Sequence, residues 1–352
     1  MKYNLNLPRC RRLIDEAIRT LGLDLTGLTV LTEAGTGPFS LTASIAALAG
    51  APRVFIAARD SPYGTAHEAI DETLHFANEL LVGKVVSILP HRFHEYLAQV
   101  DIITNLRGVR PIDRSLIEQL KPTAVVPLMF ESWEYRPEDL DIRACRARGI
   151  LVLGTNERHP HVGVLKYVGM VALRLLFESG IELLHNKVIV LGEGVFSDMA
   201  VEALHAIGAQ VEVITAGQLA SPDGSKWMEQ VALADALLVA EHVLRTPLIG
   251  SSARIKPAWL MEKNPGISVV HISGNVDRED LLRAGIRAYP EVFAPPGYMS
   301  VSTAYVGPAP VIYLHAAGLK VGAIGAQGRR LGLSPGAAED EALKNSLCQV
   351  LH

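Results

Sequence analysis

Two glycines separated by one residue, Gly192 and Gly194, stand between an apolar run at residues 187–191 and a stretch with helical spacing. In the string GEGVFS, a serine takes the place of the third glycine or alanine of the GxGxxG pattern. The first glycine permits a tight turn and the second lets a pyrophosphate approach the backbone, while free N–H groups at the helix start bind its oxygens. The sequence therefore predicts a dinucleotide-binding turn, with a purely structural turn as the alternative, at Gly192, Gly194, Val195 and Phe196.

The type of dinucleotide is left open by the next expected strand, which ends at Thr215. An acid at this position would bind the ribose 2′-hydroxyl of NAD, and a nearby arginine would accommodate the 2′-phosphate of NADP, but neither is present. We expect NAD or NADP as the cofactor, with Thr215 close to it. Further cofactor contacts are expected where residues 268–273 end, at Ser273, Gly274 and Asn275.

Three side chains could serve hydride transfer to a carbonyl group, which needs a proton donor and a cation for a substrate carboxylate. His271 and Arg107 each lie towards the end of an expected strand, at the sheet edge where open α/β proteins bind ligands. Glu131 follows another apolar run and, together with Glu134, could line a cleft. The alternatives are a hydrogen-bonded loop histidine, a solvated arginine and exposed loop acids.

A second glycine turn, at Gly35 and Gly37, follows the first apolar run of the chain, and Asp60 ends the next one. This arrangement is similar to the first motif of S-adenosylmethionine-dependent methyltransferases, in which the acid binds the ribose hydroxyls. The alternative is the first strand and loop of a substrate domain, with Gly35 allowing a substrate to approach closely. We favour the substrate-domain interpretation.

Histidines occur in two close pairs, His91 with His94 and His159 with His161. Each pair could present two imidazoles to one ion, but no third ligand stands at a fixed spacing and there is no HExxH motif. We therefore expect no metal site.

The elements that must position these residues alternate between apolar strands and helices along nearly the whole chain. Continuous Val, Ile and Leu runs without polar alternation are typical of parallel strands buried on both faces. A helical segment near residues 158–181 separates two such series. The predicted fold is α/β, with two Rossmann-like or flavodoxin-like domains that have parallel sheets.

Composition limits the classes of partner and compartment. The 352 residues carry a formal net charge of −4 and no basic block, which argues against nucleic-acid binding. The three cysteines form no CxxC motif, and neither a signal peptide nor a membrane span is evident. We expect a cytoplasmic protein with a small-molecule substrate and no membrane partner.

Three segments together resemble the D-isomer-specific 2-hydroxyacid dehydrogenases, a formate/glycerate dehydrogenase-like group. They are VDIITNLRGVRPIDRSLIEQL from residue 100, LDIRACRARGILVLGTN from residue 140, and VIVLGEG from residue 188. The resemblance implies a cofactor domain at residues 158–299 inserted into a substrate domain formed by residues 1–157 and 300–352. It also implies a homodimer, for which the apolar helix at residues 162–177 is a candidate interface; burial within a single protomer would explain this helix equally well.

The sequence departs from the pattern of that group at its catalytic positions. The loop after His271 has no arginine, and the group's Glu and His cannot be aligned with Glu291 and His315. Our leading hypothesis is an NAD(P)-dependent oxidoreductase that acts on a small carboxylate-bearing metabolite. The alternatives are a non-catalytic nucleotide- or metabolite-binding protein on the same scaffold, and a methyltransferase that uses the site from Gly35 to Asp60.

Overall fold

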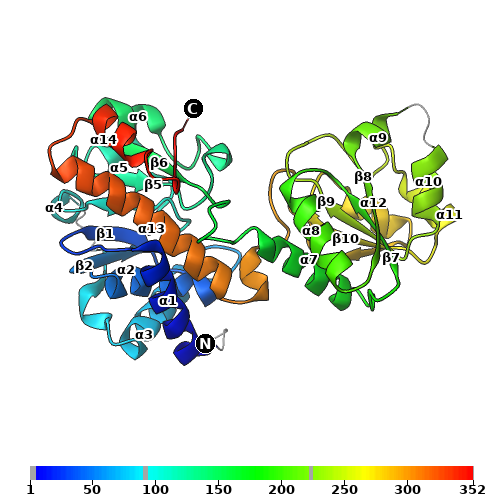
Figure 1. Ribbon diagram of the computed structural model, residues 1–352, viewed down its shortest axis with the longest axis horizontal. Helices are drawn as coiled ribbons and strands as arrows, with labels where there is room; N and C mark the ends of the chain where they lie inside the picture. The colour runs from blue at the N-terminus through cyan, green and yellow to red at the C-terminus, as the bar shows by residue number, and fades with distance from the viewer. Residues whose placement is uncertain (1–4, 90–93, 222–224, 352) are drawn as a thin grey trace. The chain divides into compact units, whose positions relative to one another are not determined.

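The computed structural model describes residues 5–89, 94–221 and 225–351, and the chain divides into two compact units (Figure 1). Unit 1 contains Met1–Val164 and Gly307–His352, and unit 2 is Leu165–Val306. The sequence analysis placed the two borders after residues 157 and 299, and this division places them after Val164 and Val306.

Unit 1 is built on a seven-stranded sheet in the order β12-β6-β5-β4-β1-β2-β3. All its strands are parallel except β12, which pairs antiparallel with β6. The chain runs outwards from β1 to β3 and then returns to β4 on the other side of β1, so the strand order reverses between β1 and β4. The strands are β1 (Thr29–Glu33), β2 (Arg53–Ala57), β3 (Val86–Ile88), β4 (Ile102–Ile103), β5 (Val125–Pro127), β6 (Leu151–Thr155) and β12 (Cys348–Gln349).

The first helix of unit 1 begins and ends at residues suited to those positions. In α1 (Leu7–Leu21), the Asn6 side chain accepts a hydrogen bond from the Arg9 amide, and Gly22 ends the helix in the left-handed conformation at φ 58°. The others are α2 (Thr42–Leu48), α3 (Ala66–Glu79), α4 (His94–Leu97), α5 (Arg114–Ile117), α6 (Ile142–Arg148), α13 (Ala309–Arg330) and α14 (Pro335–Ala342), with 3-10 turns η1 (Gly37–Leu41), η2 (Gly83–Val85) and η3 (Ser132–Glu134).

The long helix α13 lies across β4, β5 and β6 and packs against α1 (Figure 1). Within the described residues it is the one helix long and apolar enough to cross a membrane, and 78% of its apolar stretch is buried inside the protein. Gly322 makes the close approach to the sheet possible, because a Cβ atom there would lie 2.8 Å from Cγ2 of Ile102 and 3.0 Å from Cγ of Pro127.

Unit 2 is built on a fully parallel sheet in the order β11-β10-β9-β7-β8. Its order reverses between β7 and β9, which flank each other at the centre. The strands are β7 (Lys187–Leu191), β8 (Gln210–Ile214), β9 (Ala236–Ala240), β10 (Ser268–Ser273) and β11 (Arg287–Tyr289). The helices are α7 (Lys166–Glu178), α8 (Val195–Ala206), α9 (Ala216–Ala220), α10 (Ser225–Ala232), α11 (Pro257–Lys263) and α12 (Arg278–Arg283), with the 3-10 turn η4 (Thr303–Val306).

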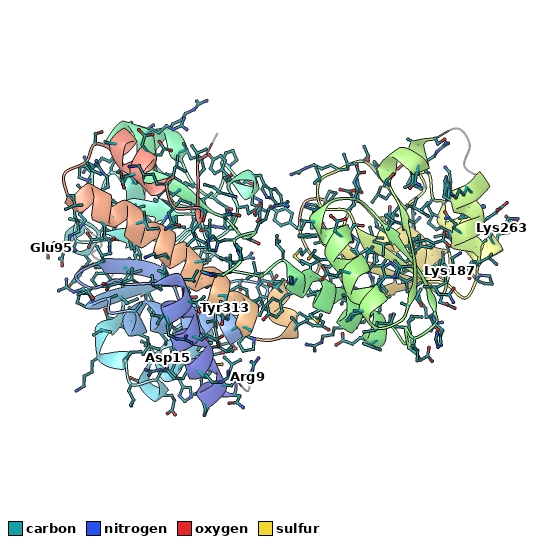
Figure 2. The ribbon with its side chains drawn as sticks, in the orientation of Figure 1. Arg9, Asp15, Glu95, Lys187, Lys263 and Tyr313 are labelled. Carbon is teal, nitrogen blue, oxygen red and sulfur yellow. The ribbon has the colours of Figure 1, made fainter. Side chains whose placement is uncertain are left out.

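Alternate residues of β7 enter two separate hydrophobic cores, one on each face of this sheet. Ile189 and Leu191 belong to the core that contains Trp227, whereas Val188 and Val190 pack in the core that contains α7 and α8. At the start of β7, the Lys187 Nζ atom pairs with the Glu212 carboxylate on β8 at 2.7 Å. Figure 2 labels Lys187 within unit 2. The predicted α/β class, with two parallel-sheet domains, is confirmed.

The apolar character of α7 has an explanation within unit 2. Val171, Leu175 and Leu176 are fully buried against the sheet and α8. The homodimer interface expected at this helix stays a prediction.

We expect Gly322→Val to lower the free energy of unfolding by about 3 kcal/mol, because the new side chain overpacks the contact with Ile102 and Pro127. Thermal and urea denaturation measure the change. The matched control is Gly336→Val in α14, where a Cβ atom would meet nothing within 4 Å. An equal loss of stability in both variants would contradict this account of α13.

Candidate functional site

The predicted glycine turn joins β7 to α8 in unit 2. Gly192 has φ +143°, and a Cβ atom on it would lie 2.8 Å from the backbone of Ala240 and Glu241. Gly194 has φ +80° and is the N-cap residue of α8, with no side chain capping the helix. The amides of Val195 and Phe196 are in the first turn of α8, where an N–H group has no acceptor within the helix. These amides and the helix dipole make this turn suitable for a phosphate group.

A buried carboxylate ties this turn to the loop after β9. Glu241 is fully buried and accepts hydrogen bonds from three backbone amides, those of Glu193 at 3.2 Å, Val243 at 2.8 Å and Leu244 at 2.9 Å. The two loops meet between β7 and β9, where the strand order reverses. Sequence reasoning missed Glu241, although an acid directly after the apolar run ALLVA was a signal for it.

Two rings stack beside the turn. The Phe196 and His242 rings lie 4.5 Å apart, centroid to centroid, at an interplanar angle of 18°. A Cβ atom on Gly194 would lie 2.9 Å from Cε1 of His242. Glycine is therefore required at position 194 both by the backbone conformation and by the position of the imidazole.

Thr215 uses its polar groups to cap α9. Its hydroxyl accepts from the Gln218 amide at 3.2 Å, and its own amide donates to the Gln218 side chain at 2.8 Å. This capping box accounts for a threonine at the end of β8.

Residues 273–275 end and follow β10, and we predicted that they contact the cofactor. In the structure they make hydrogen bonds to the loop after β9. The Ser273 carbonyl accepts from the Glu241 amide at 3.0 Å. Asn275 donates from its side chain to the Arg245 carbonyl at 2.7 Å, and its carbonyl accepts from the Leu248 amide at 2.9 Å. Gly274 at φ +142° lies so close to Val239 that a Cβ atom would be 2.7 Å from Cγ1.

His271 is fully buried, and both of its ring nitrogens are engaged. Nε2 donates to the Gly274 carbonyl at 3.0 Å, which leaves Nδ1 to accept from the Ser300 hydroxyl at 2.7 Å. The ring stacks on Phe293 at 4.4 Å. Burial lowers the pKa of His271 to about 4, so the imidazole is neutral at physiological pH. This environment favours the hydrogen-bonded structural histidine over a proton donor.

In unit 1, a buried carboxylate also stands at the reversal of strand order, between β1 and β4. Glu33 ends β1 with 5% of its surface exposed, and it accepts from the Gly108 amide at 3.1 Å. Burial raises its pKa to about 7, an effect that the Gly108 hydrogen bond and the nearby Arg110 and Arg107 charges oppose. The sequence analysis assigned no role to Glu33, although it directly precedes the glycine turn.

Two arginines follow β4 beside Glu33, and they differ in their contacts. Arg110 pairs with Asp139 at 2.8 Å and donates from Nε to the Asn105 side chain at 2.8 Å. Arg107 is exposed and lies over the Tyr63 ring at 5.7 Å. Within the described residues, Arg107 makes no ion pair, so its charge is open to an anion.

Glu131 belongs to a group of carboxylates that follows β5 and β6. One of its oxygens accepts from the Trp133 indole at 2.7 Å, and the other lies 3.9 Å from Arg158 Nε. Burial, with repulsion from Glu131, raises the pKa of Glu134 to about 7, although Arg136 opposes the shift. Burial and both neighbouring carboxylates raise the pKa of Glu157. The position of Glu131 fits a role in holding Trp133.

The glycine turn of unit 1 uses its amides within the fold. Gly35 donates to the Thr73 hydroxyl at 3.2 Å and Gly37 donates to the Glu72 carboxylate at 2.8 Å. Asp60, the acid expected to bind a ribose, accepts from the Ala66 amide at 2.8 Å.

The remaining histidines that the structure describes do not gather into a ligand set. The ring centroids of His159 and His161 lie 5.1 Å apart. His91 and the side chain of His94 lie outside the described residues. His315 is buried in α13 against Thr42, and burial lowers its pKa to about 3. Across residues 5–89, 94–221 and 225–351, no group of three or more His, Cys, Asp or Glu side chains could hold a metal ion.

Comparison with protein-family models finds no match, and no curated protein matches. Among solved structures, a dipicolinate synthase polypeptide from Bacillus halodurans matches with a TM-score of 0.53 and 13% identity, over 83% of this chain and 96% of that one. Its counterpart in the dipicolinate synthase of Bacillus subtilis has a TM-score of 0.55 and 12% identity, over 88% and 99%. The protein shares its two-domain fold with these two dipicolinate synthase structures.

NAD-dependent formate dehydrogenase from Staphylococcus aureus, in complex with NAD, also matches, with a TM-score of 0.44 and 12% identity over 83% of this chain and 93% of that one.

We expect the stability of unit 2 to depend on the protonation of His271. Between about pH 6.5 and pH 4, the unfolded chain takes up a proton that the folded imidazole does not. The stabilisation is fully present above pH 6.5 and is lost as the pH falls, by about 1.4 kcal/mol per pH unit at the steepest. Urea denaturation at a series of pH values should show a smaller loss for His271→Gln than for the wild type. His205→Gln, at an exposed position of α8, is the control; equal pH dependence in all three proteins would contradict the prediction.

Proposed function

We propose that this chain is an NAD(P)-dependent oxidoreductase, with the dinucleotide on unit 2 and a small carboxylate-bearing metabolite on unit 1. The observation that carries the proposal is the uncapped start of α8 behind Gly192 and Gly194. Neither glycine has room for a side chain, and the turn lies where the strand order of a parallel sheet reverses. Ligands of open α/β sheets bind at such points.

The contrast between the two glycine turns supports this choice. In unit 1, the Gly35 and Gly37 amides already donate to Thr73 and Glu72, and Glu72 brings a carboxylate to the turn. An acceptor group of a ligand, such as the carboxylate of S-adenosylmethionine, would have to displace these bonds. The methyltransferase alternative therefore has less support than dinucleotide binding at α8.

Arg107 and Glu33 are the residues that we assign to the substrate. The exposed guanidinium of Arg107, at the carboxyl end of β4, can pair with a carboxylate. Glu33 has a pKa of about 7, so it can hold or release a proton near neutral pH. We prefer it to His271 as the proton donor, because both nitrogens of that imidazole are hydrogen-bonded inside unit 2.

When bound, the dinucleotide would supply or accept the hydride. The protein's own residues would hold its pyrophosphate on the Val195 and Phe196 amides, orient the substrate carboxylate at Arg107 and provide the proton at a Glu33 oxygen. The alternative, a non-catalytic binding protein, predicts the same dinucleotide binding without turnover.

We expect Gly194→Ala to weaken the binding of NADH or NADPH at least about tenfold, because the methyl group strains the backbone and meets His242. Calorimetric titration of the wild type with both dinucleotides identifies the cofactor and gives the reference. Gly208→Ala is the matched control, since Gly208 has φ +82° at the other end of α8, and we expect it to lose stability without losing affinity. Failure of the wild type to bind either dinucleotide would refute the proposal.

We expect the reduction of a small 2-keto acid to depend on the protonated form of Glu33. With a panel of such acids and the dinucleotide that binds, kcat/KM of the wild type should fall as the pH rises through about 7. Glu33→Gln should lower turnover roughly 10²-fold or more and abolish this pH dependence, while Arg107→Met should mainly raise KM. An unchanged pH profile in Glu33→Gln would remove Glu33 from the mechanism, and absence of turnover by a dinucleotide-binding wild type would favour the non-catalytic alternative.

A further inference from the structure

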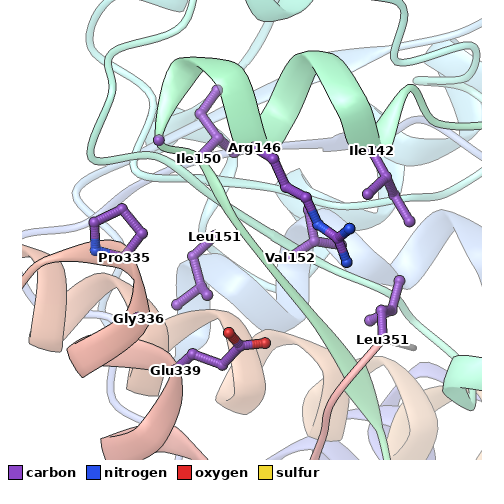
Figure 3. A pocket seen from close by; sticks show the side chains of 10 residues that line it. Ile142, Arg146, Ile150, Leu151, Val152, Pro335, Gly336, Glu339 and Leu351 are labelled. Atoms are coloured by element: carbon purple, nitrogen blue, oxygen red, sulfur yellow. The ribbon is translucent and has the colours of Figure 1, made fainter.

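Unit 1 contains a cavity that the candidate site does not use. Its volume is about 150 Å³, and it lies between α6, the start of β6, α14 and the C-terminal segment (Figure 3). Gly149 and Ile150, which line it, come immediately before β6. The cavity is therefore at the amino end of this strand, whereas Glu33 and Arg107 lie at the carboxyl edge of the same sheet.

Two opposite charges face this cavity from different helices. Arg146 extends from α6 and Glu339 extends from α14, and Figure 3 shows both side chains directed towards the space between them. Arg146 is exposed and Glu339 is half-buried. Within the part of the chain that the structure describes, neither side chain makes a hydrogen bond or an ion pair, so both charges are available to a ligand.

The surface between the two charges is apolar. Leu151 and Leu351 are buried, with 5% and 7% of their surface exposed, and Val152 is half-buried beside them. An aliphatic group placed on these side chains would lose contact with water, which favours its binding.

We propose that this cavity binds a free α-amino acid with a small aliphatic side chain, its carboxylate on Arg146 and its ammonium group on Glu339. A diacid would be repelled by Glu339 and a diamine by Arg146, whereas a zwitterion satisfies both charges. A cavity of about 150 Å³ can hold a ligand of the size of benzene, which matches an amino acid such as valine. The hydrogen bonds from Arg146 to the carboxylate and from the ammonium group to Glu339 are charge-assisted. Together they select a ligand that carries both groups.

The first test compares L-valine with two analogues, using the full chain in calorimetric titration and thermal-shift assays. 3-Methylbutanoate lacks the ammonium group and isobutylamine lacks the carboxylate. We expect L-valine to bind and to raise the melting temperature, and each analogue to bind at least about tenfold more weakly. No binding of L-valine up to about 10 mM, or equal binding of either analogue, would overturn the proposal.

The second test uses variants with matched controls. Arg146→Gln and Glu339→Gln should each weaken L-valine binding about tenfold or more, because each removes one charge-assisted contact. Arg143→Gln on α6 and Asp340→Asn on α14 change a neighbouring charge on the same helices that does not line the cavity, and these controls should bind as the wild type does. An equal loss in test and control variants would show a general effect of net charge and would overturn the assignment. This site is independent of the dinucleotide turn, so either proposal can fail alone.

Discussion

Each sheet has a buried carboxylate where its strand order reverses, and in unit 2 this carboxylate holds two loops together through backbone amides. In unit 2, Glu241 accepts three amides and joins the loops after β7 and β9. Burying an ionised carboxylate costs several kcal/mol unless hydrogen bonds replace its water, and each bond to a charged group contributes about 1.5–3 kcal/mol. The geometry of the Gly192–Gly194 turn depends on this interaction, because the turn and the loop after β9 are held at one fixed distance.

Unit 1 also has a buried carboxylate at the reversal of its strand order, but its hydrogen bonds differ. Glu33 accepts from the Gly108 amide and is left with a raised pKa, whereas Glu72 accepts from the Gly37 amide of the neighbouring turn. Two glycine turns that look alike in sequence therefore differ in what their amides can still bind. The difference comes from α3, which brings the Glu72 and Thr73 side chains to the glycine turn of unit 1. At the glycine turn of unit 2, no side chain caps the start of α8.

The sequence was sufficient to predict the alternating strands and helices and the turn at Gly192, because apolar runs and glycine spacing are local signals. It did not show the hydrogen bonds that Thr215 and His271 make. A threonine at a strand end can contact a ribose or cap a helix, and the cap on α9 depends on the Gln218 partner. His271 is paired with Ser300, 29 residues away, and only the folded chain brings the two together. Glu33 and Glu241 were overlooked for a related reason, since burial of an acid after an apolar strand depends on the loops that cover it.

The division of unit 1 into two segments has a consequence for protein synthesis. Helix α13, which covers β4, β5 and β6, belongs to Gly307–His352 and leaves the ribosome after all of unit 2. Unit 2 is continuous and can fold as soon as Val306 has emerged, whereas the apolar face of the first sheet must wait, uncovered, for α13. The nascent chain thus passes through a stage at which its N-terminal half is the part exposed to aggregation and to chaperones.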